Sequence, residues 1–229
     1  MKHSLGVIAI LTSKEMRDAW RNRWFLLFTA AFAVLALGLA RLSLAGIESG
    51  FASLGRTAAS LIQLVLLVAP LMGLTLGAAS IAGERERGTF LYLLAQPAAR
   101  WEIVMGKFLG LAAAVTVSVV AGFALAAVGI GRRAGVADLP AFLAFLGLTA
   151  LLALASVSVG LLLSSLFTRA SAATGTSLFV WLTLVLLGDA GLAGTSLALE
   201  LAPRQLLALA LLNPLNEFKL AAILELRGG

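Results

Sequence analysis

Residues 83–100 read GERERGTFLYLLAQPAAR, and they form the long polar interruption in the middle of an otherwise apolar chain. Glu and Arg alternate over 84–87, and the apolar run that follows is stopped by Pro97, which cannot continue a helix. Charged side chains are costly in lipid, and Gly88 permits a turn between the two halves. The stretch therefore predicts a charged turn and a short amphipathic helix that seats in a groove on a partner or lies on the lipid surface.

The composition places this stretch in a membrane protein. Hydrophobic residues make up 61% of the chain and charged residues 12%, and the mean hydropathy is +1.03. In soluble globular domains the charged fraction alone is about a quarter. No polar segment is long enough to build a core of its own, so we expect a single transmembrane domain over residues 1–229.

Apolar blocks divide the chain into candidate membrane spans. Each block exceeds the roughly 20 residues that a helix needs to cross a bilayer, so the sequence predicts an all-α, polytopic helix bundle. After the last block comes an apolar run too short to cross, and we expect residues 203–229 to form an external segment that leads to a sixth span. The five predicted spans are residues 24–44, 58–82, 102–130, 139–167 and 172–197.

Residues 4–23 precede the first span and predict an amphipathic helix on the membrane surface. Lys14, Arg17, Asp18 and Arg21 recur at helical spacing on one face, and apolar side chains lie near the other. One interpretation is an elbow helix that contacts a cytoplasmic partner, and the other is a basic flank that only orients the first span. The candidate contact residues are Arg17, Arg21, Arg23 and Trp24.

The net charge of +6 indicates topology rather than nucleic-acid binding, because Lys and Arg sit at the ends of apolar blocks and form no basic patch. They are denser in the N-terminal flank, in 83–107 and in 168–171 than in the loops on the opposite side. The N-terminus and the 83–100 stretch are therefore predicted to be cytoplasmic.

Asp189 is an acidic residue inside an apolar block, which makes it a candidate functional group within the membrane. It comes late in the last predicted span, so the alternative is that it simply reaches the outer interface. Small residues such as Gly73, Gly77, Gly160 and Gly175 are frequent in the spans. They predict close helix contacts, unless they only reflect an alanine- and glycine-rich composition.

The sequence lacks the combinations of residues from which common catalytic and metal sites are built. His3 is the single histidine, the chain has no cysteine, and the methionines are scattered. A histidine-based triad, a metal site and a phosphate-binding loop are therefore not expected, and neither is a cofactor. Residues 83–100 are therefore the main evidence for function in the sequence.

That stretch, with Gly106-Lys107-Phe108-Leu109-Gly110 after it, resembles the cytoplasmic coupling segment of type 2 ABC transporter permeases. Residues 21–24, Asn213-Pro214 and 218–220 are similar to a subgroup that serves copper-site maturation of nitrous-oxide reductase. The resemblance extends over essentially the whole chain.

The resemblance implies a homodimer of six-span subunits in the bacterial inner membrane, each docked on a cytoplasmic ABC ATPase, with a periplasmic copper-handling partner. In such a permease, residues 4–23 correspond to the elbow helix and 84–97 to the coupling helix between spans two and three. The subunit has no catalytic site of its own, and transmitting ATP-driven motion or moving a non-metal cargo fits its residues better than conducting copper. The implied ATPase-coupling residues are Glu84, Arg85, Glu86, Arg87, Gly88, Thr89, Leu91, Leu94 and Pro97.

Two other functions remain open at this stage. The chain could be the permease of an ABC-2 type exporter for another substrate, or a membrane scaffold or assembly factor without an ATPase. A secondary transporter ranks below both, because the spans show neither paired charges at mid-membrane depth nor matching segments broken by Gly or Pro.

Overall fold

The computed structural model describes residues 2–48, 54–96, 98–130, 139–186, 188 and 213–228. Every regular element in these ranges is a helix, which confirms the predicted all-α class. The helices are α1 (Lys2–Arg21), α2 (Arg23–Glu48), α3 (Leu54–Glu86), α4 (Thr89–Leu94), α5 (Arg100–Ile130), α6 (Leu139–Leu166), α7 (Ala170–Leu186) and α10 (Pro214–Gly228).

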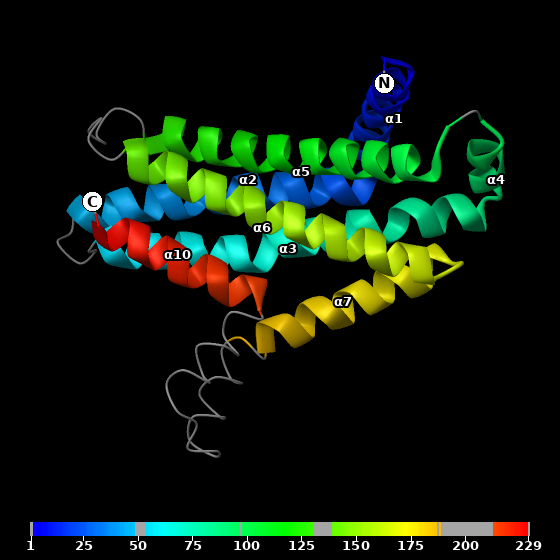
Figure 1. The fold of residues 1–229 in the computed structure, drawn as a ribbon. Coiled ribbons are helices and arrows are strands. Elements are labelled where there is room, and N and C mark those ends of the chain that lie inside the picture. The colour runs from blue at the N-terminus through cyan, green and yellow to red at the C-terminus, as the bar shows by residue number, and fades with distance from the viewer. Residues whose placement is uncertain are drawn as a thin grey trace.

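Four long helices, α2, α3, α5 and α6, lie side by side and form the body of the bundle (Figure 1). Both α1 and the short α4 lie at one end of this body, and α10 extends toward the other end (Figure 1). The chain bends by 72° between α1 and α2. Asn22 occupies the bend, and its Oδ1 accepts a hydrogen bond from the backbone N–H of Trp24 at 3.0 Å, which caps α2.

Three described helices are long and apolar enough to cross a membrane, over 60–86, 100–125 and 142–166. The bent pair of α1 and α2 makes a fourth span if the two helices are counted together, and α7 is a shorter apolar helix. The chain is thus a bundle of several membrane-spanning helices. The count of five spans and the surface position of α1 stay predictions.

Helix α1 packs on α5 along a row whose buried residues include Ala19 of the predicted apolar face, on which the sequence places Leu5, Ile8, Met16, Ala19 and Trp20. Its buried residues are Leu11, Glu15 and Ala19, whereas Leu5 and Met16 are 66% and 37% exposed. The spacing of the buried residues is one helical turn each, so a single narrow row of α1 faces α5. Apolar character alone did not identify this row because a glutamate lies at its centre.

Small residues set the contact between α3 and α6. A Cβ atom placed on Gly77 would lie 2.7 Å from the backbone oxygen of Val157, and one on Gly160 would lie 2.5 Å from that of Leu74. Both glycines therefore permit close backbone approach, and the helix-contact interpretation is correct for them. Gly175 on α7 has open space around it instead.

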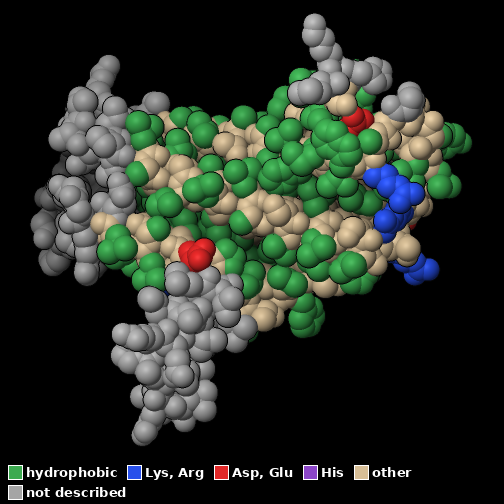
Figure 2. Space-filling model, in the orientation of Figure 1, with side chains coloured by type: hydrophobic (Ala, Val, Ile, Leu, Met, Phe, Trp, Pro, Cys, Tyr) green, Lys and Arg blue, Asp and Glu red, His purple; other side chains and the backbone are tan. Residues whose placement is uncertain are grey.

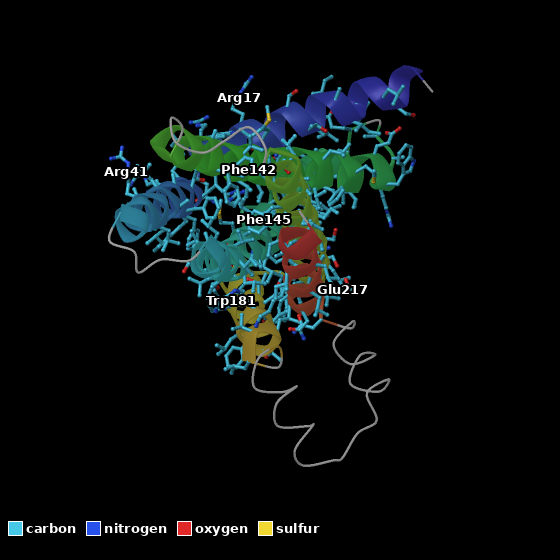
Figure 3. The ribbon with its side chains drawn as sticks, turned by 90° about the vertical axis from the view of Figure 1, so that its left-hand side faces the viewer. Arg17, Arg41, Phe142, Phe145, Trp181 and Glu217 are labelled. Atoms are coloured by element: carbon cyan, nitrogen blue, oxygen red, sulfur yellow. The ribbon has the colours of Figure 1, made fainter. Side chains whose placement is uncertain are left out.

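An aromatic cluster ties α10 into the bundle. Phe123 of α5 contacts Phe142 and Phe145 of α6 edge to face, and Phe145 contacts Phe218 of α10 with ring centroids 5.8 Å apart (Figure 3). Of the expected external segment, residues 203–212 lie outside the described residues. Residues 214–228 are a helix packed on α6 and α3, and the external position of this segment stays a prediction.

The start of α10 is held by Asn213. Its Oδ1 accepts a hydrogen bond from the backbone N–H of Leu215 at 3.0 Å, and its Nδ2 donates one to the backbone carbonyl of Leu184 at 2.7 Å. Pro214 follows in the first helical position, where its missing N–H costs little. Asn213 thus caps α10 and joins it to the end of α7 with the same side chain.

We predict that Gly77→Ala destabilises the bundle by about 1–3 kcal/mol, because the added methyl group meets backbone atoms that cannot turn aside. Thermal unfolding in mild detergent measures the effect. Gly147→Ala on α6 is the matched control, since a Cβ there meets no atom within 4 Å. Equal unfolding temperatures for the two variants would refute the close-contact explanation.

Candidate functional site

The last turn of α3 and the short helix α4 form a junction at one end of the bundle. Gly88 has a φ of 72°, in the left-handed region, and so turns the chain sharply between α3 and α4. The predicted turn and the predicted short helix are both present, and the helix covers Thr89–Leu94. The side chains of Glu84, Arg85 and Glu86 come directly before this turn, and each contacts a different part of the bundle.

Glu84 belongs to a charge cluster of four residues, Lys14, Glu15, Glu84 and Lys107. Lys107 of α5 is completely buried, and its Nζ lies 2.7 Å from Glu15 Oε1 and 2.9 Å from Glu84 Oε2. Lys14 Nζ lies 2.6 Å from Glu84 Oε1 and 3.0 Å from Glu15 Oε1. Each lysine therefore bridges the same two carboxylates, so the charges of these four residues balance, and Lys14 Nζ also lies 3.5 Å from Oδ2 of the half-exposed Asp18 at the rim.

Balance matters because an ion taken out of water without a partner is strongly destabilising. Lys107 also donates a hydrogen bond to Ser80 Oγ at 3.3 Å, so the ammonium has three polar neighbours. Lys14 lies at the rim, with a side chain that is 44% exposed. Burial disfavours its charged form, but the carboxylates of Glu84 and Glu15 outweigh burial and raise the pKa of Lys14 above its ordinary value.

Two glycines on α5 let α1 come close enough to complete the cluster. A Cβ on Gly106 would lie 2.5 Å from the Cβ of Leu11, and one on Gly110 would lie 2.6 Å from the Cβ of Glu15. Lys107 stands between these glycines in sequence. The segment Gly106–Gly110 thus supplies both the space for α1 and the cation that Glu15 requires.

Arg85 and Glu86 hold the turn between α6 and α7. Arg85 Nη1 donates hydrogen bonds to the backbone carbonyls of Ser165 at 2.7 Å and Phe167 at 3.2 Å, at the end of α6. Glu86 Oε2 accepts a hydrogen bond from the backbone N–H of Ala170 at 2.9 Å, at the start of α7. A cation at a helix C-terminus and an anion at an N-terminus both complement the helix dipole.

Helix α4 projects apolar side chains outward. Leu91 is 73% exposed, Tyr92 77% and Leu94 40%, and no residue of α4 is buried. Thr89 Oγ1 donates a hydrogen bond to the backbone carbonyl of Glu84 at 3.3 Å, which fastens the start of α4 to the end of α3. An apolar surface rigidly joined to α3 suits contact with a partner.

The other predicted site residues are spread out. Arg17, Arg21, Arg23 and Trp24 are exposed around the bend between α1 and α2, and Arg17 points away from the bundle (Figure 3). Pro97 and Asp189 lie outside the described residues. Within the part of the chain that the structure describes, no group of three His, Cys, Asp or Glu side chains could hold a metal ion.

Glu15 and Lys107 were not identified as site residues from the sequence. Glu15 sits in a helix rich in exposed charge, so nothing nearby marks it as buried. Lys107 carried a usable signal, because it falls inside the predicted 102–130 span, and a charge inside a span is a functional candidate by default. Because Lys107 lies near the start of that span, it resembles a lysine at the membrane interface, and the signal was therefore not used.

Comparisons with known proteins agree with the architecture. A family model described as "ABC-2 family transporter protein" matches residues 9–228. A protein of Pseudomonas aeruginosa named "Probable ABC transporter permease protein NosY" is 35% identical over 223 residues, covering 94% of this chain and 81% of the relative. A protein of the same name from Stutzerimonas stutzeri is 36% identical over 217 residues, covering 92% of this chain and 79% of the relative.

We predict that Lys107→Met destabilises the protein by about 3–5 kcal/mol, because it leaves two carboxylates buried with one partially exposed cation between them. Lys14→Met is the comparison variant: it removes a lysine that contacts the same carboxylates, but from the wetter rim, so its cost is smaller. Thermal unfolding in detergent measures both. Adding Glu15→Gln to Lys107→Met should recover part of the loss, and equal effects of the two lysine variants would contradict the burial argument.

Proposed function

The chain belongs to the ABC-2 family of transporter proteins, and from that premise we propose that it couples ATP hydrolysis by a separate cytoplasmic ATPase to movement of its own membrane helices. As a permease subunit of this family it is a multi-pass protein of the bacterial inner membrane. The ATPase acts on α4, and the end of α3 passes the movement on. The N-terminus lies on the same cytoplasmic side, as the distribution of Lys and Arg favours.

The observation that carries the proposal is the set of ties at the end of α3. Glu84 binds Lys14 of α1 and Lys107 of α5, Arg85 binds the end of α6, and Glu86 binds the start of α7. These residues directly precede the turn into α4. A displacement of α4 therefore acts on four other helices at once through short polar contacts, which is what transmission of force requires.

We further propose that the process served is copper-site maturation of nitrous-oxide reductase. The resemblance to the subgroup with that role and the two relatives named NosY support this. The chain has no cysteine and one histidine, so it suits the transmission of motion or the passage of a non-metal cargo better than conduction of copper. A copper-handling protein on the periplasmic side completes the system.

A second copy of the chain is the proposed partner of α7. One face of α7 stays uncovered in the described bundle, with Phe179 74% exposed, Leu182 44% exposed and open space around Gly175. A face that mixes a glycine with large apolar residues permits close helix approach in lipid. The homodimer implied by the family resemblance would use this face.

We predict that replacing Leu91 and Tyr92 together by serine abolishes copurification of the ABC ATPase in mild detergent, because the exposed apolar surface of α4 is lost. Leu224→Ser is the matched control, since Leu224 of α10 is 71% exposed but lies toward the opposite end. Retention of the ATPase by the double variant would favour a scaffold without this coupling.

A second double variant distinguishes docking of the ATPase on α4 from transmission of its movement to the other helices. We predict that Arg85→Gln combined with Glu86→Gln keeps the ATPase bound, because α4 is intact, but loses function, because α6 and α7 are released from α3. The readouts are ATPase copurification, and nitrous-oxide reduction by a denitrifying host that lacks its own NosY. A native chain that assembles with the ATPase but fails to restore the host would indicate an exporter of another substrate.

A further inference from the structure

At the α4 end of the molecule, the carboxylates contact other groups of the chain, whereas several exposed arginines have no carboxylate partner among the residues that the structure describes. Two of the carboxylates make contacts within the chain: Glu84 is 6% exposed in the charge cluster, and Glu86, which is exposed, accepts the hydrogen bond from the N–H of Ala170. Glu102, also 6% exposed, accepts a hydrogen bond from the backbone N–H of Ala99 at 2.9 Å and caps α5. Asp18 is half-exposed at this end and lies 3.5 Å from Lys14 Nζ, so each of these four carboxylates already has a polar contact within the chain.

Exposed arginines lie at the same end. Arg87, Arg100 and Arg169 are all exposed, and in the described parts of the chain none of them has a carboxylate within 4.0 Å. Figure 2 shows basic side chains gathered at the end where α4 and the turn between α6 and α7 lie. Arg85, their neighbour, is occupied by the carbonyls at the end of α6.

These three arginines, here called the arginine rim, come from segments at the same end of the bundle as α4 (Figure 1). Arg87 precedes α4 at the turn, Arg100 begins α5 after it, and Arg169 lies in the turn between α6 and α7. A Cβ on Gly83 would lie 3.4 Å from Arg87 Nη1 and 3.8 Å from the Cβ of Ala170. Arg87 and the turn that carries Arg169 therefore lie beside the same point of α3.

We propose that the ATPase surface that receives α4 is an apolar groove with carboxylates at its edge, and that these carboxylates pair with the arginine rim. The inference rests on the proposed function, because it assumes that an ATPase docks on α4. Arginine binds carboxylates through paired hydrogen bonds, and such pairs set orientation and partner choice as well as affinity. Leu91 and Tyr92 supply the apolar centre that such a rim surrounds in protein interfaces.

An anionic lipid surface is the competing ligand for exposed arginines. The arrangement favours a protein, because the arginines come from three separate places in the chain and lie at the same end of the bundle as a helix of six residues that projects from α3 (Figure 1). A lipid-bound helix instead carries its basic residues along its own polar face. The α4 sequence itself, TFLYLL, contains no basic residue.

The test uses the ATPase that copurifies with the native chain, purified separately and titrated onto the chain in detergent at increasing NaCl concentrations. We predict that Arg87→Gln, Arg100→Gln and Arg169→Gln together weaken binding about tenfold or more and reduce its dependence on salt, as expected for the loss of several rim pairs. Arg41→Gln, which removes an exposed charge from α2 near the opposite end, should leave binding unchanged (Figure 3).

The outcomes separate this inference from the proposed function. If the triple variant binds the ATPase like the native chain while the serine variant of Leu91 and Tyr92 does not, the rim proposal is overturned and the docking of α4 stands. If neither variant affects binding, the proposed function fails as well. If the triple variant keeps the ATPase but loses binding to phosphatidylglycerol vesicles, the rim serves lipid instead. Unchanged elution and thermal unfolding of each variant show that it is folded.

Discussion

A completely buried lysine, Lys107, is the constraint on which the rest of the junction depends. Its ammonium group requires anions, and Glu15 and Glu84 supply them from helices that are distant in sequence. Satisfying Lys107 therefore places α1 on α5 and brings the end of α3 to both. Gly106 and Gly110 are needed for the same reason, because larger side chains would hold Glu15 out of reach.

The four charged side chains at 84–87 differ in the parts of the molecule that they contact. Glu84 and Arg85 turn inward to α1, α5 and α6, and Glu86 is exposed but accepts a hydrogen bond from the start of α7. Arg87 is exposed and has no carboxylate partner in the described chain. Three of the four charged residues that the resemblance implies for coupling thus contact other helices of the same chain, and the outward apolar surface belongs to α4. In the proposed function, this division lets one segment both receive a partner and distribute its movement.

The bundle behind the junction is suited to carry movement as a unit. Backbone contacts at Gly77 and Gly160 join α3 to α6 without intervening flexible side chains, and the aromatic cluster around Phe145 joins α5, α6 and α10 farther along. Closely packed helices transmit displacement because their interfaces have few alternative arrangements. The stiff contacts lie along the length of α3 and α6, and the polar ties lie at the end next to α4.

The sequence by itself determined the all-α class, the turn at Gly88 and the short helix before Pro97, because these depend on residues that are near one another along the chain. It also determined the family, since the residues around the coupling segment carry the resemblance. Only the tertiary structure decided that Lys107 pairs with Glu15, 92 positions away, and that Glu86 caps α7. Such pairings follow from which helices pack together and how closely, and local sequence does not specify either.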